Sequence, residues 1–318
     1  MNCNILISSA GRRVSLIRAF RESLEELNLT GQIFISDLNP KLAPAYYFAD
    51  GVLELPRNSE KNYIEKLLAQ CLKFKISIII PTIDTELENL AIYMEKFSEN
   101  GIEIIISSKE LVSNLRDKKQ TFKIFDQIGI PNIPTQNPPD FRFPVFYKPF
   151  NGSLSKGIGI AESVNQLSNH LLSDTSLIWT DYLDSNKYNE FTVDCYYSKK
   201  GDLITLVPRQ RIETRGGEVS KAKTIKGSLF HILNSKMSKL VGARGCITLQ
   251  VFYSKDENEL FGIEINPRFG GGYPLSFHAG ANYPKLILQE YFLNQELSEN
   301  NDWIENKMMI RFDQEIII

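Results

Sequence analysis

GIEINPR, residues 262–268, is the stretch that decides the fold, because apolar and polar residues alternate in it at the period of a β-strand. Side chains two apart on a strand point to the same face. The spacing therefore predicts that Glu264, Asn266 and Arg268 lie on one face, with the isoleucines between them on the other. Such a polar row at the end of an apolar strand is a candidate binding site.

Gln250 lies in the middle of a second apolar run, residues 247–252. If the two strands are neighbours, the oxygen atoms of Gln250, Glu264 and Asn266 converge on one point. Mg²⁺ binds oxygen donors of this kind, with phosphates and waters completing its octahedron. A polar outer face on an ordinary antiparallel strand explains the same pattern, and the two interpretations stay open at this point.

A glycine-rich stretch at residues 151–159 lies between two apolar strands further upstream, with Lys148 just before it and Lys156 inside it. Backbone amides in such a loop can approach phosphate oxygens closely because glycines carry no side chain, and lysines add charge to the same anion. The stretch is not a Walker loop, since no G-K-[ST] ends it at the start of a helix. A plain hairpin connection has the same composition.

The first third of the chain alternates between strands and helices. Short, isoleucine-rich runs predict strands buried on both faces, and apolar residues at helical spacing predict helices between them. The expected strands are 4–9, 32–37, 76–81 and 102–107, and the expected helices are 14–27, 63–74 and 87–97. This order predicts a doubly wound α/β domain.

A dinucleotide site in this domain is a weaker interpretation than a scaffold or substrate-binding role. The turn after the first strand has the single glycine Gly11 and lacks the G-x-G-x-x-G pattern. Asp37 ends the second strand and fits a ribose ligand, although acidic residues are common at strand ends.

After residue 108 the pattern changes to one long helix followed mostly by strands. A helix is expected over 109–128, with a terminator at 129–134 and a turn-rich linker at 137–140. The expected strands are 143–149, 177–179, 190–197, 203–211, 247–253 and 260–265, with an edge strand at 314–318. The expected helices are 164–172, 229–241 and 284–292.

Length and charge exclude several classes of protein. The chain of 318 residues is long enough for two or three domains, and 36 basic against 38 acidic residues argue against a protein that coats nucleic acid or an anionic membrane. The four cysteines lie apart without a CxxC pair, so we expect buried thiols and neither zinc nor disulfides. The start lacks a signal-peptide pattern and no apolar run approaches the length of a membrane helix, so a cytoplasmic protein is expected.

Taken in order, the strand lysine, the glycine loop, Gln250 and the E-x-N-P-R motif resemble the ATP-grasp superfamily of carboxylate–amine ligases. The closest resemblance is to the branch like the large subunit of carbamoyl-phosphate synthase, and it covers nearly the whole chain. It implies a Rossmann-like pre-ATP-grasp domain (1–108), a subdomain A with the phosphate loop (109–183) and a subdomain B with the metal site (184–297), followed by a C-terminal tail (298–318).

The resemblance also assigns the nucleotide site. Lys118 and Lys148 match the lysines that meet the ATP phosphates, and residues 179–183 match the hinge that reads adenine through its backbone. Thr180 departs from the family, since many members have Glu there. The residues implied for ATP are Lys118, Lys148, Gly152, Ser153, Lys156, Gly157, Gly159, Asp181, Tyr182 and Leu183, with Glu190 on the ribose hydroxyls.

The remaining roles concern the metal and the reacting groups. Gln250, Glu264 and Asn266 match the magnesium ligands, and Arg268 matches the arginine that faces the reacting phosphoryl or acyl group, with Lys148 as the second catalytic residue. The residues that resemble the substrate pocket are Arg209, Arg211, Arg215, Gly271, Gly272 and His278. A lone histidine such as His278 is more often structural than functional.

The implied activity is a ligase that uses ATP and one or two Mg²⁺ ions, with Mn²⁺ as a substitute, to activate a carboxylate as an acyl phosphate and pass it to an amine. Its partners would be small molecules, without nucleic acid or membrane, and its assembly a homodimer. Two alternatives remain: an ATP-binding regulatory module without catalysis, and an NAD-dependent dehydrogenase built on residues 1–108.

Overall fold

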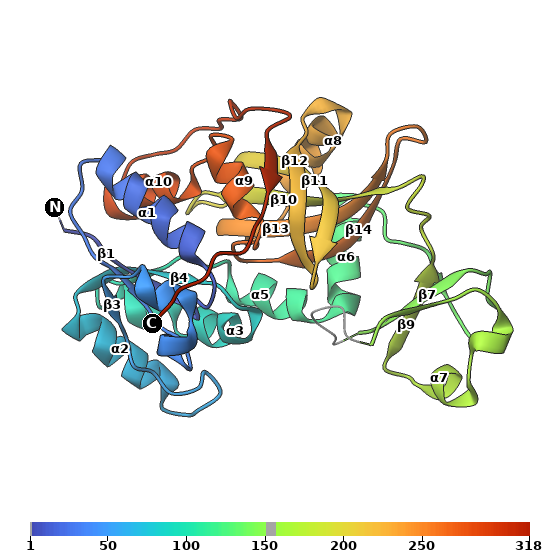
Figure 1. Cartoon of the computed structure of the whole chain (residues 1–318), viewed down its shortest axis with the longest axis horizontal. Helices are drawn as coiled ribbons and strands as arrows, with labels where there is room; N and C mark the ends of the chain where they lie inside the picture. The colour runs from blue at the N-terminus through green and yellow to red at the C-terminus, as the bar shows by residue number, and fades with distance from the viewer. Residues whose placement is uncertain (1, 151–156) are drawn as a thin grey trace.

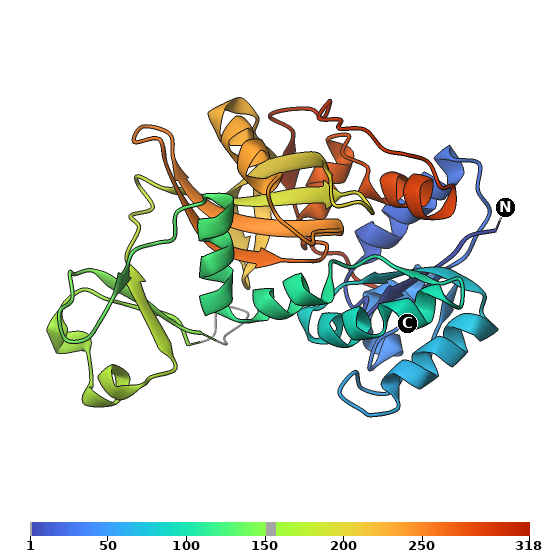
Figure 2. The ribbon, with the colours of Figure 1, turned by 180° about the vertical axis from the view of Figure 1, so that it is seen from behind.

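In the computed structural model, which describes residues 2–150 and 157–318, the chain forms sheets of five, six and four strands. The six-stranded sheet lies between the other two, with the five-stranded domain at one end of the molecule and the four-stranded sheet at the other (Figures 1 and 2). No helix in the described residues is both long and apolar enough to cross a membrane.

The N-terminal sheet is parallel, in the order β3-β2-β1-β4-β5. Its strands are β1 (Asn4–Ser8), β2 (Ile33–Ile35), β3 (Gly51–Val52), β4 (Ile76–Pro81) and β5 (Glu103–Ile104). Alternate residues of β1 enter different cores, since Ile5 and Ile7 pack in one cluster and Leu6 in another. The predicted doubly wound domain is confirmed, and β3, which is two residues long, carries no periodicity from which it could be predicted.

Helices α1 (Val14–Glu26), α2 (Tyr63–Lys73), α3 (Asp84–Ile92) and α4 (Met94–Ser98) connect these strands. A single helix over 87–97 was the expectation, and the structure divides it at Tyr93. All four cysteines are buried and free, as predicted.

The predicted helix over 109–128 is in fact two helices, α5 (Lys109–Arg116) and α6 (Lys118–Ile128). Asp117 breaks it, with extended backbone angles and a side chain that accepts a hydrogen bond from the Lys119 amide at 2.8 Å. Aspartate is a preferred N-cap because its carboxylate satisfies the free amides of a first turn. The break makes Lys118 the first residue of α6, and Gly129, with φ of 77°, ends the helix as predicted.

The small sheet has the order β6-β9-β7-β8. Its strands are β6 (Thr135–Gln136), β7 (Val145–Pro149), β8 (Gly159–Ala161) and β9 (Leu177–Asp181). The helix expected at 164–172 forms as a short 3₁₀ turn (Val164–Gln166) and α7 (Asn169–Ser173). Val145, Ala161, Leu167 and Trp179 make its separate core.

The large sheet has the order β14-β13-β10-β11-β12-β15 and is antiparallel. Its strands are β10 (Asn189–Tyr197), β11 (Leu203–Arg215), β12 (Glu218–Thr224), β13 (Gly245–Ser254), β14 (Glu259–Asn266) and β15 (Met308–Ile310). The helices of this part are α8 (Gly227–Met237), α9 (Tyr273–His278), α10 (Tyr283–Ile287) and a π-helical turn (Leu288–Phe292).

The C-terminal segment corrects one expectation. Met308–Ile310 pairs with β12 as the edge strand, whereas residues 314–318 form no strand. Trp303, which precedes this strand, has a buried side chain. We propose the domain boundaries given above, with part of the expected tail joined to subdomain B.

Helix α1 joins the N-terminal domain to the large sheet by packing on α9 and α10. The rings of Phe20 and Phe269 lie 6.4 Å apart, and the Ser23 hydroxyl donates to the Asn282 side chain at 2.9 Å. This contact sets the carboxyl edge of the parallel sheet beside the end of β14, where the predicted site lies.

Candidate functional site

The predicted metal ligands lie side by side on β13 and β14. Gln250 is directly opposite Glu264 in the strand pairing, and Thr248 is opposite Asn266. The Asn266 amide nitrogen donates to Glu264 Oε1 at 2.8 Å, which leaves its amide oxygen available as a donor to a cation. The described residues contain no group of three or more His, Cys, Asp or Glu side chains suited to a metal. A cation here would bind one carboxylate, two amides and the oxygens of a substrate.

Two lysines face this cluster from other parts of the chain. Lys118, at the start of α6, donates to the Pro149 carbonyl oxygen at 2.5 Å, and Lys148 comes from β7. Burial and, to a smaller extent, the charge of Lys118 lower the pKa of Lys148 to about 8, against the opposing effect of Glu264. Burial also lowers the pKa of Lys118, against the effect of Glu264. The lysines and the carboxylate therefore lie within electrostatic reach of one another.

Glu190 completes what we call the nucleotide end, defined by Lys118, Lys148, Glu190, Gln250 and Glu264, and Arg211 pairs with it. Glu190 Oε1 lies 3.1 Å from Arg211 Nε, and Arg211 Nη1 donates to the Thr192 hydroxyl at 3.3 Å. Burial raises the pKa of Glu190, Arg211 lowers it and Glu264 raises it. Arg211, expected near the acid substrate, is thus paired with the acid expected at the ribose.

The glycine loop is only partly described. Gly152, Ser153 and Lys156 lie outside the described residues. Gly157 has a φ of 72°, which favours glycine, and Gly159 lies opposite Tyr147, where a Cβ atom would overlap the tyrosine ring. Gly159 therefore has a packing role of its own, and a contact of these two glycines with phosphate is a proposal.

At the hinge, the Asp181 amide donates to the Pro134 carbonyl at 2.9 Å and its carboxylate pairs with Arg142 at 3.0 Å. That amide is therefore engaged within the sheet, and adenine recognition would fall to the half-buried Tyr182 and Leu183. Thr180 is buried, and its hydroxyl has no hydrogen-bond partner among the described residues.

Arg268 is paired with an acidic residue of the N-terminal domain. Its Nε and Nη2 donate to the two oxygens of Asp84 at 2.8 and 2.7 Å. Asp84 is the first residue of α3, so the pair joins the E-x-N-P-R motif to the N-terminal domain. The expected contact of Arg268 with the reacting phosphoryl group stays a proposal, because Asp84 holds the guanidinium in this conformation. Sequence reasoning missed Asp84 because it lies far from Arg268 along the chain.

Arg209, which was expected near the substrate, forms an internal ion pair. It is fully buried and makes a bidentate pair with the fully buried Asp194, at 2.8 and 3.0 Å. Ser276 of α9 donates to Asp194 as well, at 2.5 Å. The arginine is therefore part of the packing between β11, β10 and α9. Asp194 follows Glu190 and Thr192 at period-two spacing, and that alternation was the signal that could have revealed it.

Arg215 lines a cavity of about 350 Å³ that we call the arginine pocket, defined by Arg12, Arg215, Glu218, Arg311 and Asp313. The expected Gly271 is next to it, since its carbonyl accepts from Arg311 Nη2 at 2.6 Å. Gly272 lies against the Arg209 guanidinium and against Val219, and Val219 also lines the cavity. Arg12 and Arg311 were missed because they come from opposite ends of the sequence.

His278 is exposed at the end of α9, and its ring contacts Phe277. No contact links it to the nucleotide end or to the arginine pocket within the part of the chain that the structure describes. Its expected place in the substrate pocket stays a proposal without support from these contacts.

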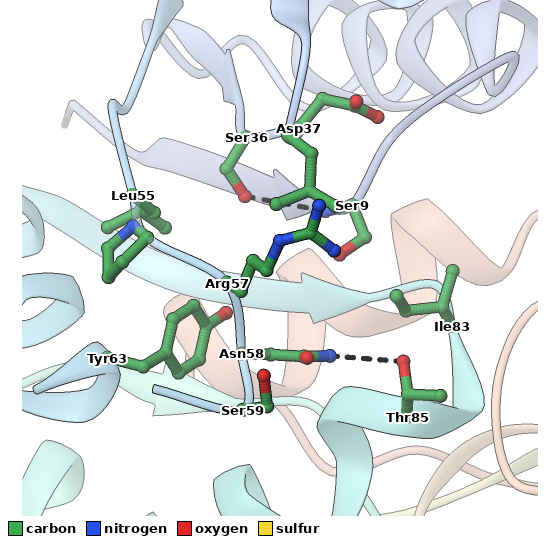
Figure 3. A pocket seen from close by; sticks show the side chains of 12 residues that line it. Ser9, Ser36, Asp37, Leu55, Arg57, Asn58, Ser59, Tyr63, Ile83 and Thr85 are labelled. Carbon is green, nitrogen blue, oxygen red and sulfur yellow. Dashed lines mark hydrogen bonds between the residues drawn. The ribbon is translucent and has the colours of Figure 1, made fainter. Parts of the chain in front are cut away.

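A second cavity, of about 270 Å³, lies at the carboxyl edge of the parallel sheet (Figure 3). The Asp37 carboxylate at its rim accepts a hydrogen bond from the Gly11 amide at 3.1 Å, so part of its capacity holds the turn after β1. The Arg57 side chain extends between Ser9 and Tyr63 in this view. The cavity is where doubly wound domains place small ligands.

Two family models match the chain. The model described as "PylC-like, N-terminal domain" matches residues 5–105, and the one described as "ATP-grasp in the biosynthetic pathway with Ter operon" matches residues 173–314. A carbamoyl-phosphate synthase of Methanobrevibacter smithii is 24% identical over 217 residues, which are 62% of this chain and 58% of that protein. The match thus spans little more than half the length of that relative.

Solved structures share the fold. Biotin carboxylase from Campylobacter jejuni superposes with a TM-score of 0.71 at 18% identity, over 96% of this chain and 74% of that one. N5-carboxyaminoimidazole synthetase from Staphylococcus aureus, complexed with ADP, has a TM-score of 0.68 at 16% identity, over 93% and 79%. An L-amino acid ligase from Bacillus licheniformis has a TM-score of 0.65 at 17% identity, over 91% and 74%.

Proposed function

We propose that this chain, which joins a PylC-like N-terminal domain to an ATP-grasp domain, is an ATP-dependent carboxylate–amine ligase. One observation carries the proposal: α6, β7 and β14 bring Lys118, Lys148 and Glu264 within electrostatic reach of one another. Two lysines beside a carboxylate are the charges that a metal-bound triphosphate needs. The names of the similar proteins support the same class of reaction.

The donor set fits magnesium. Glu264, Gln250 and Asn266 offer hard oxygen atoms on two adjacent strands, and these are the donors that Mg²⁺ selects. One or two Mg²⁺ ions, or Mn²⁺ in their place, would neutralise charge on the terminal phosphates. The second carboxylate of the nucleotide end, Glu190, would accept hydrogen bonds from ribose hydroxyls.

The chain's own residues then position the reacting groups. Phosphoryl transfer has a loose transition state, so catalysis depends on orientation and charge neutralisation. Lys118 and Lys148 hold the phosphates while a carboxylate oxygen attacks the γ-phosphorus and ADP leaves. The amine nitrogen attacks the acyl carbon, its proton passes to solvent, and phosphate leaves. Arg268 would release Asp84 and then hold the acyl phosphate.

A screen of carboxylates crossed with amines, read by ADP release and by mass spectrometry of products, tests this function. Wild type should release ADP with at least one acid, and Lys148→Ala and Glu264→Ala should each abolish that release. Lys187→Ala is the control, because Lys187 is an exposed lysine paired with Glu257 at 3.4 Å. Full activity in either site variant would contradict the proposed function.

Thermal shift separates the two alternatives. A regulatory module would be stabilised by Mg-ATP yet release no ADP with any acid. A dehydrogenase built on residues 1–108 would be stabilised by a nicotinamide dinucleotide and not by Mg-ATP. We further propose a cytoplasmic homodimer with small-molecule substrates, and size-exclusion chromatography with light scattering checks its assembly.

A further inference from the structure

Three segments that are distant in sequence meet at the arginine pocket. The turn after β1 contributes Arg12, the hairpin between β11 and β12 contributes Arg215 and Glu218, and the segment after β15 contributes Arg311 and Asp313. In Figure 1 the C-terminal segment, in dark red, runs from β15 toward the N-terminal domain. The pocket is therefore assembled only when the N-terminal domain, the large sheet and the C-terminal segment are together.

Positive charge exceeds negative charge in this pocket. Arg311 Nη1 lies 2.8 Å from Glu218 Oε2, Arg12 Nη2 lies 3.8 Å from Glu218 Oε1, and Arg215 pairs with Asp313 at 2.8 Å. Glu218 thus serves two arginines at once, and the arginines lower its pKa against the effect of burial. Three arginines share two carboxylates, which leaves one positive charge over.

The charge excess continues to the end of β14. Arg13, beside Arg12, is desolvated by burial and repelled by Arg268, which together lower its pKa, while Glu218 and Asp84 oppose them. Arg13 Nη2 donates to the Thr82 carbonyl oxygen at 3.4 Å. With the Arg268–Asp84 pair, five arginines face three carboxylates, so two positive charges are left over next to the E-x-N-P-R motif.

We propose that the carboxylate substrate carries a second anionic group, a carboxylate or a phosphate, and that Arg311 and Arg12 bind this group. The inference rests on the proposed function, since it names the substrate class of that same site. A monoanion would leave one of the two surplus charges without a counter-ion in a partly desolvated pocket. A dianion neutralises both, and arginine suits carboxylate and phosphate because its planar fork donates two parallel hydrogen bonds.

Arg311 is the main specificity-determining residue of the pair. Its side chain is 28% exposed, whereas that of Arg12 is 80% exposed. The Gly271 carbonyl and Glu218 hold the guanidinium of Arg311 from two sides, so it is oriented before any ligand arrives. Arg12 contributes charge from a solvated position.

Matched acids test the proposal in the ADP-release assay. L-glutamate is compared with L-glutamine, L-aspartate with L-asparagine, and 3-phosphoglycerate with glycerate, each with the same amines. Within the pair that contains the active acid, kcat/KM should favour the doubly anionic member by about 10- to 100-fold, the value of one charge-assisted contact. The glutamate and phosphoglycerate pairs distinguish a carboxylate from a phosphate as the second group.

Variants assign the preference to the pocket. Arg311→Gln and Arg12→Gln should each lower the preference for the doubly anionic acid while stabilisation by Mg-ATP is kept, and Arg311→Lys should restore part of it. Arg21→Gln, which removes an ion pair to Asp50 at 3.2 Å elsewhere in the N-terminal domain, should keep the full preference. Arg12 is too exposed for its substitution to affect folding. The Arg12 variant therefore still tests the proposal if the Arg311 variant does not fold.

The outcomes separate this proposal from the proposed function. ADP release with a monocarboxylate equal to or above that with its doubly anionic partner overturns the dianion and leaves the ligase standing. An unchanged preference in both pocket variants overturns the assigned residues. ADP release with no acid at all counts against both.

Discussion

Lys148 at the nucleotide end and Arg311 in the arginine pocket are both partly buried cations, yet their surroundings differ. No carboxylate lies within 4.0 Å of Lys148 among the described residues, and burial lowers its pKa to about 8. Arg311 already has Glu218 at 2.8 Å. The first site is therefore ready to accept an anion, whereas the second must exchange one anion for another.

This difference predicts how the two substrates bind. Phosphates relieve the desolvation of Lys148 directly, so nucleotide binding gains the full electrostatic interaction. An acid that enters the arginine pocket competes with Glu218, Asp313 and Asp84, and its net gain is smaller. The competition also discriminates, because only a ligand with enough negative charge displaces the resident carboxylates.

Removing one cation from the nucleotide end and one from the arginine side of the site tests this comparison most strongly. Lys148→Met should lower kcat/KM by about 100- to 1000-fold, as expected for a lost transition-state contact, and should abolish stabilisation by Mg-ATP. Arg268→Met should lower turnover while Mg-ATP still stabilises the protein. Equal loss of nucleotide binding in the two variants would show that the ends are not distinct. Steady-state kinetics and thermal shift measure both.

The Asp194–Arg209 pair tests whether Arg209 is a structural residue or part of the substrate site. Asp194→Ala should destabilise the fold by about 3–5 kcal/mol, because it leaves a fully buried guanidinium without its carboxylate. Asp313→Ala breaks an exposed pair and should cost less than about 1 kcal/mol. Denaturant titration measures both. Equal stability of the two variants would return Arg209 to the set of substrate residues.

Proton uptake sharpens the claim about Lys148. An unfolded lysine has a pKa of about 10.4, so the free folded protein loses this proton as the pH rises through about 8. Phosphates raise the pKa again, so Mg-ATP binding at pH 8 should take up about half a proton, and affinity should fall at higher pH. Calorimetry in buffers of different ionisation enthalpy measures the uptake. Lys148→Arg should bind without it; uptake that persists there would assign the proton elsewhere.

The smallest expected effect concerns the competing carboxylate. Asp84→Asn removes the charge that holds Arg268, so KM for the acid should fall by about 3- to 10-fold, with nucleotide binding unchanged. Initial rates at saturating Mg-ATP measure the change. A higher KM would mean that Asp84 positions Arg268 for the acid and does not compete with it.

Local periodicity predicted the parts of the molecule that depend on neighbouring residues. The alternation in residues 262–268 placed Glu264 and Asn266 on one face, and isoleucine-rich runs predicted β1 and β4. Helical spacing predicted one helix through Asp117, whereas the resemblance to the family has residues 116–118 open a helix, as α6 does after its Asp117 cap. Helix propensity alone predicts an unbroken helix over 109–128.

Long-range pairing could not be predicted in the same way. Arg209 and Arg215 lie in the same strand, and only the cover by α9 makes one a buried structural residue and the other a pocket residue. Asp84 meets Arg268, and Arg12 meets Glu218, across domains that no sequence period connects. The nucleotide end was therefore largely predictable, and the arginine pocket was not.

The most direct test of the central claim follows oxygen from the acid. With a carboxylate labelled with ¹⁸O, the attack on the γ-phosphorus carries one labelled oxygen into the acyl phosphate, and the phosphate released by the amine keeps it. Mass spectrometry should find one ¹⁸O in each released phosphate, and Glu264→Ala should release none. Unlabelled phosphate formed together with the amide product would contradict an acyl phosphate and, with it, the proposed mechanism.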